Sequence, residues 1–179
     1  MTARPGTAAA DHCDHTSVGV LVSSSAGLLV FDRATPPIGI APVAGHIDQH
    51  GSPEQAAQVE AAEEVGLTVS HLHLVLETRR SNQCRRRPTG PVGHHWWIFK
   101  AQASGPLRPS HREVRAPRWI HPTLLQHHAL RTAAYAQGHL SGQAFEREPG
   151  LAPVWVRFFH DLHLVTLHDD VLDQIDSVI

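Results

Sequence analysis

Alternating apolar and polar residues predict a series of β-strands in the first two thirds of the chain. Two β-rich runs, SVGVLVSS and GLLVFDR, lie on either side of the turn-like segment SSSAG. A further apolar stretch, IGIAPVAGHID, follows two prolines. The segment LTVSHLHLVLETRR alternates like a half-buried strand, and HHWWIFKAQA and VRAPRWI indicate two more strands.

One segment between these strands, residues 53–65, has the composition and the end signals of an α-helix. Ser52 is a favourable N-cap, Pro53 occupies the first helical position, and Gly66 follows the last one. The small apolar residues recur every four positions and are expected to face a core: Ala57, Ala61 and Val65.

The last third of the chain has a helical pattern. HPTLLQHHALRTAAYAQGHL predicts a helix after its proline, and APVWVRFFHDLHLV predicts another helix or an apolar closing element. Strands, a central helix, further strands and then helices indicate an α+β fold or a mixed α/β sandwich. We expect a flexible lead-in over residues 1–15 and a single domain over 16–179, with a C-terminal helical extension from about residue 122.

Composition narrows the class of protein. The chain has 179 residues, 41% of them hydrophobic, and a formal charge of −2, which is typical of one globular domain and not of a nucleic-acid coating protein. Its apolar runs are too short to span a bilayer, and its N-terminus lacks the apolar region of a secretory signal. Two cysteines do not make a disulfide scaffold. We therefore expect a cytoplasmic protein without nucleic-acid or membrane partners.

The predicted helix carries three carboxylates on one face. Glu60, Glu63 and Glu64 stand at positions i, i+3 and i+4, where like charges repel each other. Hard divalent cations such as Mg²⁺ and Mn²⁺ prefer carboxylate oxygens and relieve that repulsion. A solvated acidic helix face explains the same triplet equally simply, so the triplet alone does not identify a site.

The surrounding residues resemble a known motif. The stretch GHIDQHGSPEQAAQVEAAEEVGL, residues 45–67, is similar to the Nudix box, G-x5-E-x7-R-E-U-x-E-E-x-G-U, where U is an apolar residue. In this register Gly45 is the opening glycine and Gly66 the closing one, and the three carboxylates coincide with those of the motif. The resemblance covers roughly residues 16–130 and implies a Nudix-like α/β/α sandwich with a central mixed sheet.

Two positions depart from the motif. Gly51 stands where the motif has its first glutamate, and Val59 stands where it has arginine. Because the glutamate and the arginine of the motif are both replaced, a supporting charge pair is absent, but no single buried charge is left without its partner. We interpret this as a change around intact metal ligands, although such supporting groups can contribute tenfold or more to metal affinity or activity.

The resemblance implies a Nudix pyrophosphohydrolase with Mg²⁺ as cofactor and Mn²⁺ as an alternative. Glu60, Glu63 and Glu64 would hold the metal, and Glu63, Glu64 and a downstream glutamate would act in catalysis. Glu113 is the best-placed downstream candidate and Glu77 the second. The implied substrate is a nucleotide or another small molecule with a diphosphate linkage, such as a nucleotide sugar, a dinucleotide or a (d)NTP. A catalytically weak or inactive nucleotide-binding protein of the same fold is the alternative.

Candidate substrate-binding residues lie in and around the basic segment RRSNQCRRRPTGPVG. Arginine matches phosphate oxygens bidentately, although GC-rich coding also favours arginine over lysine. Trp96 and Trp97 are adjacent in a predicted strand and so point to opposite faces, one toward the core and one available to stack on a base. The substrate-binding candidates are Arg79, Arg80, Arg85, Arg87 and Trp97.

Two questions stay open at this level. Cys13 and Cys84, with histidines near Cys13, raise the question of a zinc site, but the pattern lacks a C-x2-C pair. The apolar residues of the C-terminal extension suit either a cap over the site or a homodimer interface, and the sequence does not choose between them.

Overall fold

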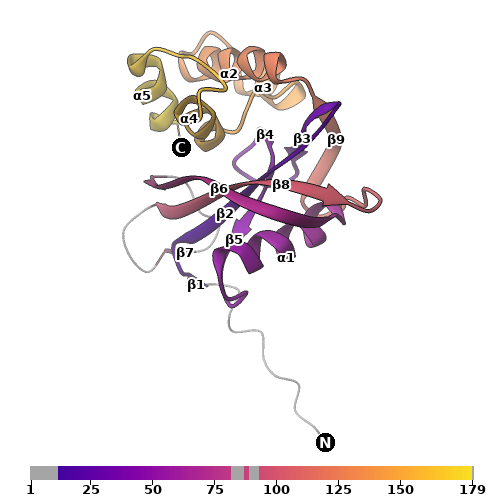
Figure 1. Ribbon diagram of the computed structural model, residues 1–179. Coiled ribbons are helices and arrows are strands. Elements are labelled where there is room, and N and C mark those ends of the chain that lie inside the picture. The colour runs from indigo at the N-terminus through magenta and orange to yellow at the C-terminus, as the bar shows by residue number, and fades with distance from the viewer. Residues whose placement is uncertain (1–11, 82–86, 89–92, 179) are drawn as a thin grey trace, which may run out of the picture.

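A mixed β-sheet with helices on both faces organises the protein (Figure 1). The structure is a computed structural model, and it describes residues 12–81, 87–88 and 93–178. The strands are β1 (His12–Cys13), β2 (Thr16–Ser24), β3 (Gly27–Arg33), β4 (Ile40–Ala41), β5 (Val43–His46), β6 (Thr68–Arg80), β7 (Arg87–Pro88), β8 (His94–Ser104) and β9 (Val114–Ile120). The helices are α1 (Pro53–Val65), α2 (Pro122–Ala136), α3 (Gly142–Arg147), α4 (Pro153–Asp161) and α5 (Asp169–Ser177).

The main sheet has the strand order β4-β3-β2-β8-β6. β2 and β8 run parallel, whereas β6–β8, β2–β3 and β3–β4 are antiparallel. β5 also pairs with the first half of β2, and β9 pairs with β3. The strands at the centre are almost wholly buried because helices cover both faces. The mixed sheet and its flanking helices confirm the predicted α+β fold.

Helix α1 covers one face of the sheet, as the spacing of its small residues predicts. Ala57, Ala61 and Val65 are each 0% exposed, and they pack against apolar residues of β2, β3 and β8. A capping box closes the N-terminus of the helix, because the Ser52 hydroxyl accepts a hydrogen bond from the Gln55 backbone while the Gln55 side chain accepts one from Ser52. The local pattern thus determined this helix correctly.

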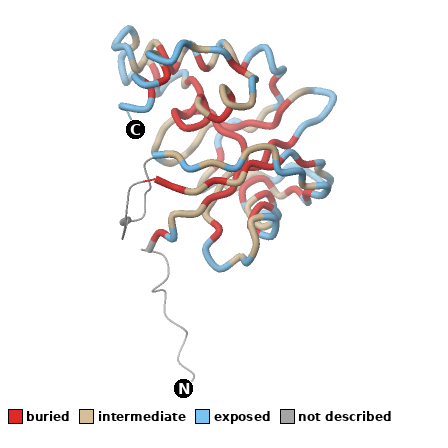
Figure 2. The backbone as a smooth tube through the Cα atoms, turned by 60° about the vertical axis from the view of Figure 1, so that its left-hand side comes forward, coloured by how far each residue is buried: buried red, intermediate tan, exposed pale blue. Residues whose placement is uncertain are grey.

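Helices α2 to α5 form the layer on the opposite face (Figure 1). Helix α4 contributes the centre of this layer, where Trp155, Phe158 and Phe159 are each 0% exposed. Gly19 of β2 makes room for the indole, because a Cβ atom there would lie 2.5 Å from Trp155 Cη2. The buried segments therefore gather between the sheet and its two helical layers (Figure 2).

The chain is already packed before Thr16, where the sequence places the start of the domain. Cys13 is 0% exposed, and its Sγ lies 3.1 Å from His94 Nε2. Residues 13–15 therefore belong to the folded unit, and the remainder of the expected lead-in, residues 1–11, lies outside the described part. Among the described residues, none of the helices has the length and apolar character that a bilayer span requires.

Candidate active site

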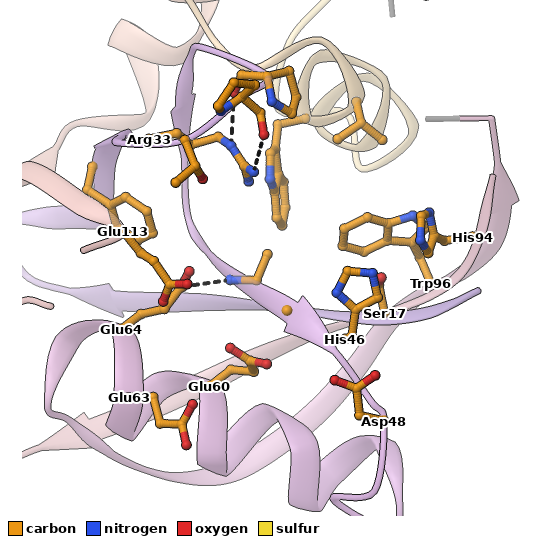
Figure 3. A pocket seen from close by; sticks show the side chains of 18 of the residues that line it. Ser17, Arg33, His46, Asp48, Glu60, Glu63, Glu64, His94, Trp96 and Glu113 are labelled. Carbon is orange, nitrogen blue, oxygen red and sulfur yellow. Dashed lines mark hydrogen bonds between the residues drawn. The ribbon is translucent and has the colours of Figure 1, made fainter. Parts of the chain in front are cut away.

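A cavity of about 300 Å³ opens between α1, the β2–β5 pair and the start of α4 (Figure 3). Its volume is at the lower end of the range usual for small-molecule sites. Residues of α1 and the loop before β9 supply acidic side chains to one part of the lining, whereas β5, β8 and α4 supply histidine and aromatic side chains to another. The cavity therefore combines charged and aromatic walls.

Glu64 is the most deeply buried acid in the cavity, with 7% of its surface exposed. Its Oε2 atom accepts a hydrogen bond of 3.0 Å from the backbone N–H of Ala44 in β5 (Figure 3). Burial raises the pKa of Glu64 well above its usual value, and the nearby charges of Glu60 and Glu113 raise it further, against the opposing effects of the Ala44 hydrogen bond and Arg33. A divalent cation here would replace the proton and compensate the buried charge.

Glu60 lies one helical turn before Glu64, and its carboxylate packs on the backbone of β5. An ideal Cβ atom on Gly45 would come within 1.9 Å of both Cδ and Oε1 of Glu60. Gly45 pairs with Val18 in β2, so its position is determined by the sheet. The opening glycine of the motif is therefore required for space, because any side chain there would displace the carboxylate.

Glu63 and Glu113 complete the acidic wall. Glu63 is exposed on α1 and lines the cavity beside Glu60 (Figure 3). Glu113 is half-buried and comes from the loop before β9. That loop is attached to the end of α1, since the N–H of Ser110 donates to the Glu64 carbonyl at 2.7 Å. This attachment brings Glu113 close to a helix that is about fifty residues away in sequence.

The second glycine of the motif ends α1. Gly66 has a φ of 72°, in the left-handed region that favours glycine, and its N–H donates to Ala62 at 3.1 Å. A Cβ atom there would also lie 2.6 Å from the Cβ of Arg108. Gly66 thus ends the helix and lets the segment that leads to Glu113 pack against its end.

The two departures from the motif lie outside the carboxylate cluster. Gly51 is exposed and has a φ of 91°, a conformation that a glutamate side chain would strain. A Cβ atom there would also meet the Gln55 side chain of the capping box at 2.2 Å. Val59 is half-buried on α1. The loop conformation has therefore adapted to glycine, and a glutamate restored at position 51 would not fit it without rearrangement.

Two arginines that the sequence analysis did not select also line the cavity. Arg33, at the end of β3, donates from Nε to the Pro37 carbonyl at 2.9 Å, and Arg112 precedes Glu113. Both positive charges lie next to the acidic wall, where they can bind anionic groups of a substrate. Arg112 lies among other arginines of residues 108–118, but Arg33 is nearly eighty positions away, so the sequence gives no sign that the two meet.

The opposite wall is formed by His46, His94, Trp96 and Trp155 (Figure 3 labels the first three). His46 and His94 lie edge to face, with ring centroids 5.2 Å apart. Burial lowers the pKa of His94 to about 4, and the neighbouring His46 and His15 contribute to this shift. His94 is therefore neutral at physiological pH and contributes an uncharged ring to this wall.

The structure places several predicted substrate-binding residues away from this cavity. Arg80 is paired with Asp161 at the end of α4, while Arg79 is exposed on β6. Trp97 packs with the apolar cluster under α1 and stacks on His95, whereas Trp96 lines the cavity. Glu77, the second candidate for the downstream glutamate, is exposed, and its Oε1 lies at hydrogen-bond distance, 2.9 Å, from His95 Nε2. The alternation of Trp96 and Trp97 was foreseeable, but which of them faces the site was not.

Two further candidates fall where no side chain is described. Arg85 lies outside the described residues, as does Cys84, and of Arg87 the structure describes only its backbone in β7. A role of Arg79, Arg80, Arg85, Arg87 or Trp97 in substrate binding stays a prediction. The residues that the structure adds to the candidates are Arg33, Arg112, Trp96 and Trp155.

The sheet between two helical layers, with an acidic helix facing a cavity, defines the class of hydrolases to which the motif pointed. The NUDIX domain model matches residues 14–139, and the chain belongs to this family. Within the family it is a pyrophosphohydrolase. The match spans the sheet, α1 and α2 and ends before α3, so the last three helices lie beyond it.

Solved structures show the same fold. A NUDIX-family hydrolase from Clostridium perfringens is similar with a TM-score of 0.51 and 19% identity, covering 63% of this chain and 85% of that one. The dihydroneopterin triphosphate pyrophosphohydrolase of E. coli has a TM-score of 0.53 and 17% identity, with coverage of 63% and 84%. No curated protein matches the chain significantly by sequence.

Proposed function

We propose that the protein hydrolyses a diphosphate linkage in a nucleoside diphosphate derivative and that it requires Mg²⁺, with Mn²⁺ as a substitute. The observation that carries this proposal is the convergence of Glu60, Glu63, Glu64 and Glu113 on one cavity, with Glu64 buried. With Asp48, five acids line this cavity, and together they oppose the binding of an anionic substrate unless cations are also present. Family membership supports the reaction class, and the carboxylates support the metal.

The donor set fits a hard divalent cation. Carboxylate oxygens are the preferred ligands of Mg²⁺, which usually keeps water or substrate phosphate in its remaining positions. Glu60, Glu63 and Glu64 would hold the ion, with the Gly45 backbone leaving room for the first of them. When bound, the ion would neutralise charge on the phosphate oxygens and lower the pKa of a coordinated water.

The other side chains of the cavity would bind the substrate and transfer a proton. Arg33 and Arg112 bind phosphate oxygens of the substrate, which limits the repulsion from the acidic wall. Glu113 accepts a proton from the water that attacks phosphorus, while the P–O bond of the linkage breaks and its electron pair leaves with the departing phosphate group. Trp96 and Trp155 provide the aromatic wall against which a base or another flat group can pack.

Several classes of compound could serve as the substrate. A nucleotide sugar, a dinucleotide and a (d)NTP all present a diphosphate together with a ring system, and these features suit the arginines and the aromatic wall of the cavity. The E. coli relative acts on dihydroneopterin triphosphate, which has the same two features. We therefore propose a small diphosphate-containing molecule with a flat ring as the substrate.

A panel of these compounds tests the proposal. Phosphate release, coupled to a phosphatase where the product requires it, is measured with Mg²⁺, with Mn²⁺ and with a chelator. The double variant Glu63→Gln/Glu64→Gln is expected to lose turnover, and Glu146→Gln, an exposed acid on α3, is its matched control. Metal-independent turnover, or full turnover in the double variant, would contradict the proposal.

The alternative of a nucleotide-binding protein makes a different prediction in the same assay. Gly51 and Val59, which replace the charge pair of the motif, are the observation that favours it. No turnover on any compound, combined with a nucleotide-induced rise in melting temperature, would support this alternative over hydrolysis.

A further inference from the structure

We propose that Cys13, His15 and His94 form a second metal site, selective for a borderline-soft transition metal such as zinc. One donor atom of each residue lies within 4.8 Å of those of the other two. The Cys13 Sγ is 3.1 Å from His94 Nε2. The three residues come from two chain segments about eighty positions apart, which the pairing of β2 with β8 brings together.

The orientation of His15 is the first independent support. Its Nδ1 lies 3.0 Å from the carbonyl oxygen of Gly93. A carbonyl oxygen accepts hydrogen bonds, so Nδ1 carries the proton and Nε2 presents its lone pair. Histidines that bind metals commonly donate their other ring N–H to a backbone carbonyl in this way. The tautomer that metal binding requires is therefore already selected.

The environment of that lone pair is the second support. His15 Nε2 is buried and has no hydrogen-bond partner among the described residues. A buried acceptor without a partner is costly, and native proteins rarely keep one without a ligand or water. The other two donors are also withdrawn from solvent, since Cys13 is 0% exposed and His94 is 1% exposed. A metal ion bound between the three side chains would supply the partner that His15 Nε2 lacks.

The donor types separate this site from the carboxylate cluster. A thiolate and two imidazoles are typical ligands of zinc, whereas Mg²⁺ prefers carboxylate oxygens. Both sites meet the same cavity, because His94 lines it beside His46 while the carboxylates line it from α1. The protein would thus hold a hard cation and a softer one on different walls.

The position of the site indicates a structural role. Cys13 and His15 flank the turn before β2, and His94 begins β8, two positions before Trp96. A metal ion would join the beginning of the folded chain to the strand that carries the aromatic wall. We infer that it stabilises this wall, and that its removal lowers the melting temperature of the protein.

Metal analysis of the full chain tests the site directly. The protein is purified without added metal or chelator, and its zinc content is measured by mass spectrometry. We expect about one zinc per chain, and a thiolate-to-cobalt charge-transfer band after replacement with Co²⁺. Wild-type protein that binds neither ion would overturn the proposal.

Variants assign the ligands. His15→Asn is preferred because His15 has a φ of 58°, a conformation that asparagine tolerates well. We expect this variant and Cys13→Ser to lose zinc, and Cys13→Ser to lose the charge-transfer band as well. His73→Gln, an exposed histidine on β6, is the control and keeps both. Zinc retained in full by folded His15→Asn and Cys13→Ser, as judged by circular dichroism, would contradict the assignment.

The same measurements keep this site apart from the proposed hydrolase site. Glu63→Gln/Glu64→Gln is expected to lose turnover and to retain its zinc. In buffer without Mg²⁺, a chelator that removes zinc is expected to lower the melting temperature of the wild type, and to leave that of His15→Asn unchanged. Zinc lost from the glutamate variant would instead assign the ion to the carboxylate cluster and overturn the second site.

Discussion

The carboxylate of Glu60 lies so close over the backbone of Gly45 that a Cβ atom at position 45 would come within 1.9 Å of Glu60 Oε1. Gly45 belongs to β5, and Glu60 belongs to α1. The contact therefore sets the separation between the sheet and the acidic face of the helix. A motif glycine and a motif glutamate fifteen positions apart act as one structural unit.

Gly45→Ala should reduce metal affinity and turnover together. The new methyl group would displace the Glu60 carboxylate, because neither the paired strand nor the buried helix can move easily. Loss of a supporting contact around a metal typically costs about 10- to 100-fold in affinity or activity. Turnover as a function of Mg²⁺ concentration measures the effect. Gly142→Ala is the control, since a Cβ atom there meets nothing within 4 Å; equal Mg²⁺ dependence in the two variants would disprove the explanation.

Glu64 should make the metal-free protein less stable as pH rises. Burial raises the pKa of its carboxyl in the folded state above the usual 4.5, so the folded protein keeps a proton that the unfolded chain has lost. The contribution to stability is complete below about pH 4.5 and is lost progressively as pH rises through the folded-state pKa. Glu64→Gln removes this dependence and still offers Ala44 an acceptor oxygen.

Chelator-treated Glu64→Gln is therefore expected to melt a few degrees above the wild type at pH 8, with the difference disappearing toward pH 4. Addition of Mg²⁺ should raise the melting temperature of the wild type more than that of the variant. Thermal unfolding between pH 4 and 8 measures both effects. The exposed Glu63→Gln serves as the comparison, and a metal-free wild type as stable as Glu64→Gln at pH 8 would refute the prediction.

Arg112→Gln should raise KM for the substrate by about tenfold, the lower end of what a charged hydrogen bond contributes. Arg112 lines the cavity beside Glu113, whereas Arg79, which sequence analysis selected, is exposed on β6. Steady-state kinetics of Arg112→Gln and Arg79→Gln decide between the two positions. A larger KM effect in Arg79→Gln would support the sequence-based choice. Arg147→Gln, at an exposed arginine on α3, is the control and should leave KM unchanged.

Gly19→Ala should destabilise the protein by about 1–3 kcal/mol, the usual result of overpacking a core. The added methyl group would lie 2.5 Å from Trp155 Cη2 and 2.8 Å from Ile98 Cδ1. Denaturant unfolding measures the loss. Because Trp155 also lines the cavity, KM should rise in the same variant. An unchanged unfolding free energy would mean that α4 can shift on the sheet without cost.

Local patterns predicted much of this protein. The capping residues, the fourfold spacing of Ala57, Ala61 and Val65, and the closing Gly66 determined α1 correctly, because helix formation and helix faces depend on neighbours within a few positions. The alternating segments gave most of the strands for the same reason. The resemblance of residues 45–67 to the motif led to the family that the whole-domain match establishes.

Local sequence patterns did not predict the contacts between segments that are distant along the chain. Alternation places Trp96 and Trp97 on opposite faces, but the packing of α1 and α4 decides that Trp96 faces the cavity. The sequence also does not show that Arg80, a predicted phosphate-binding residue, pairs with Asp161, eighty-one positions away. The sequence likewise does not distinguish Arg112 from the other arginines of residues 108–118, because only the packing of the loop before β9 brings Arg112 to the cavity.

The sequence by itself determined the helix with its three carboxylates, the glycines that flank it and the family, since all of these depend on residues close together along the chain. The tertiary structure alone decided which side chains share the cavity, how deeply Glu64 is buried, and that Cys13 and His15 meet His94. The physical reason is that burial, electrostatic coupling and metal-ligand geometry depend on distances in space. Those distances arise from strand pairing and helix packing between segments that are remote in sequence.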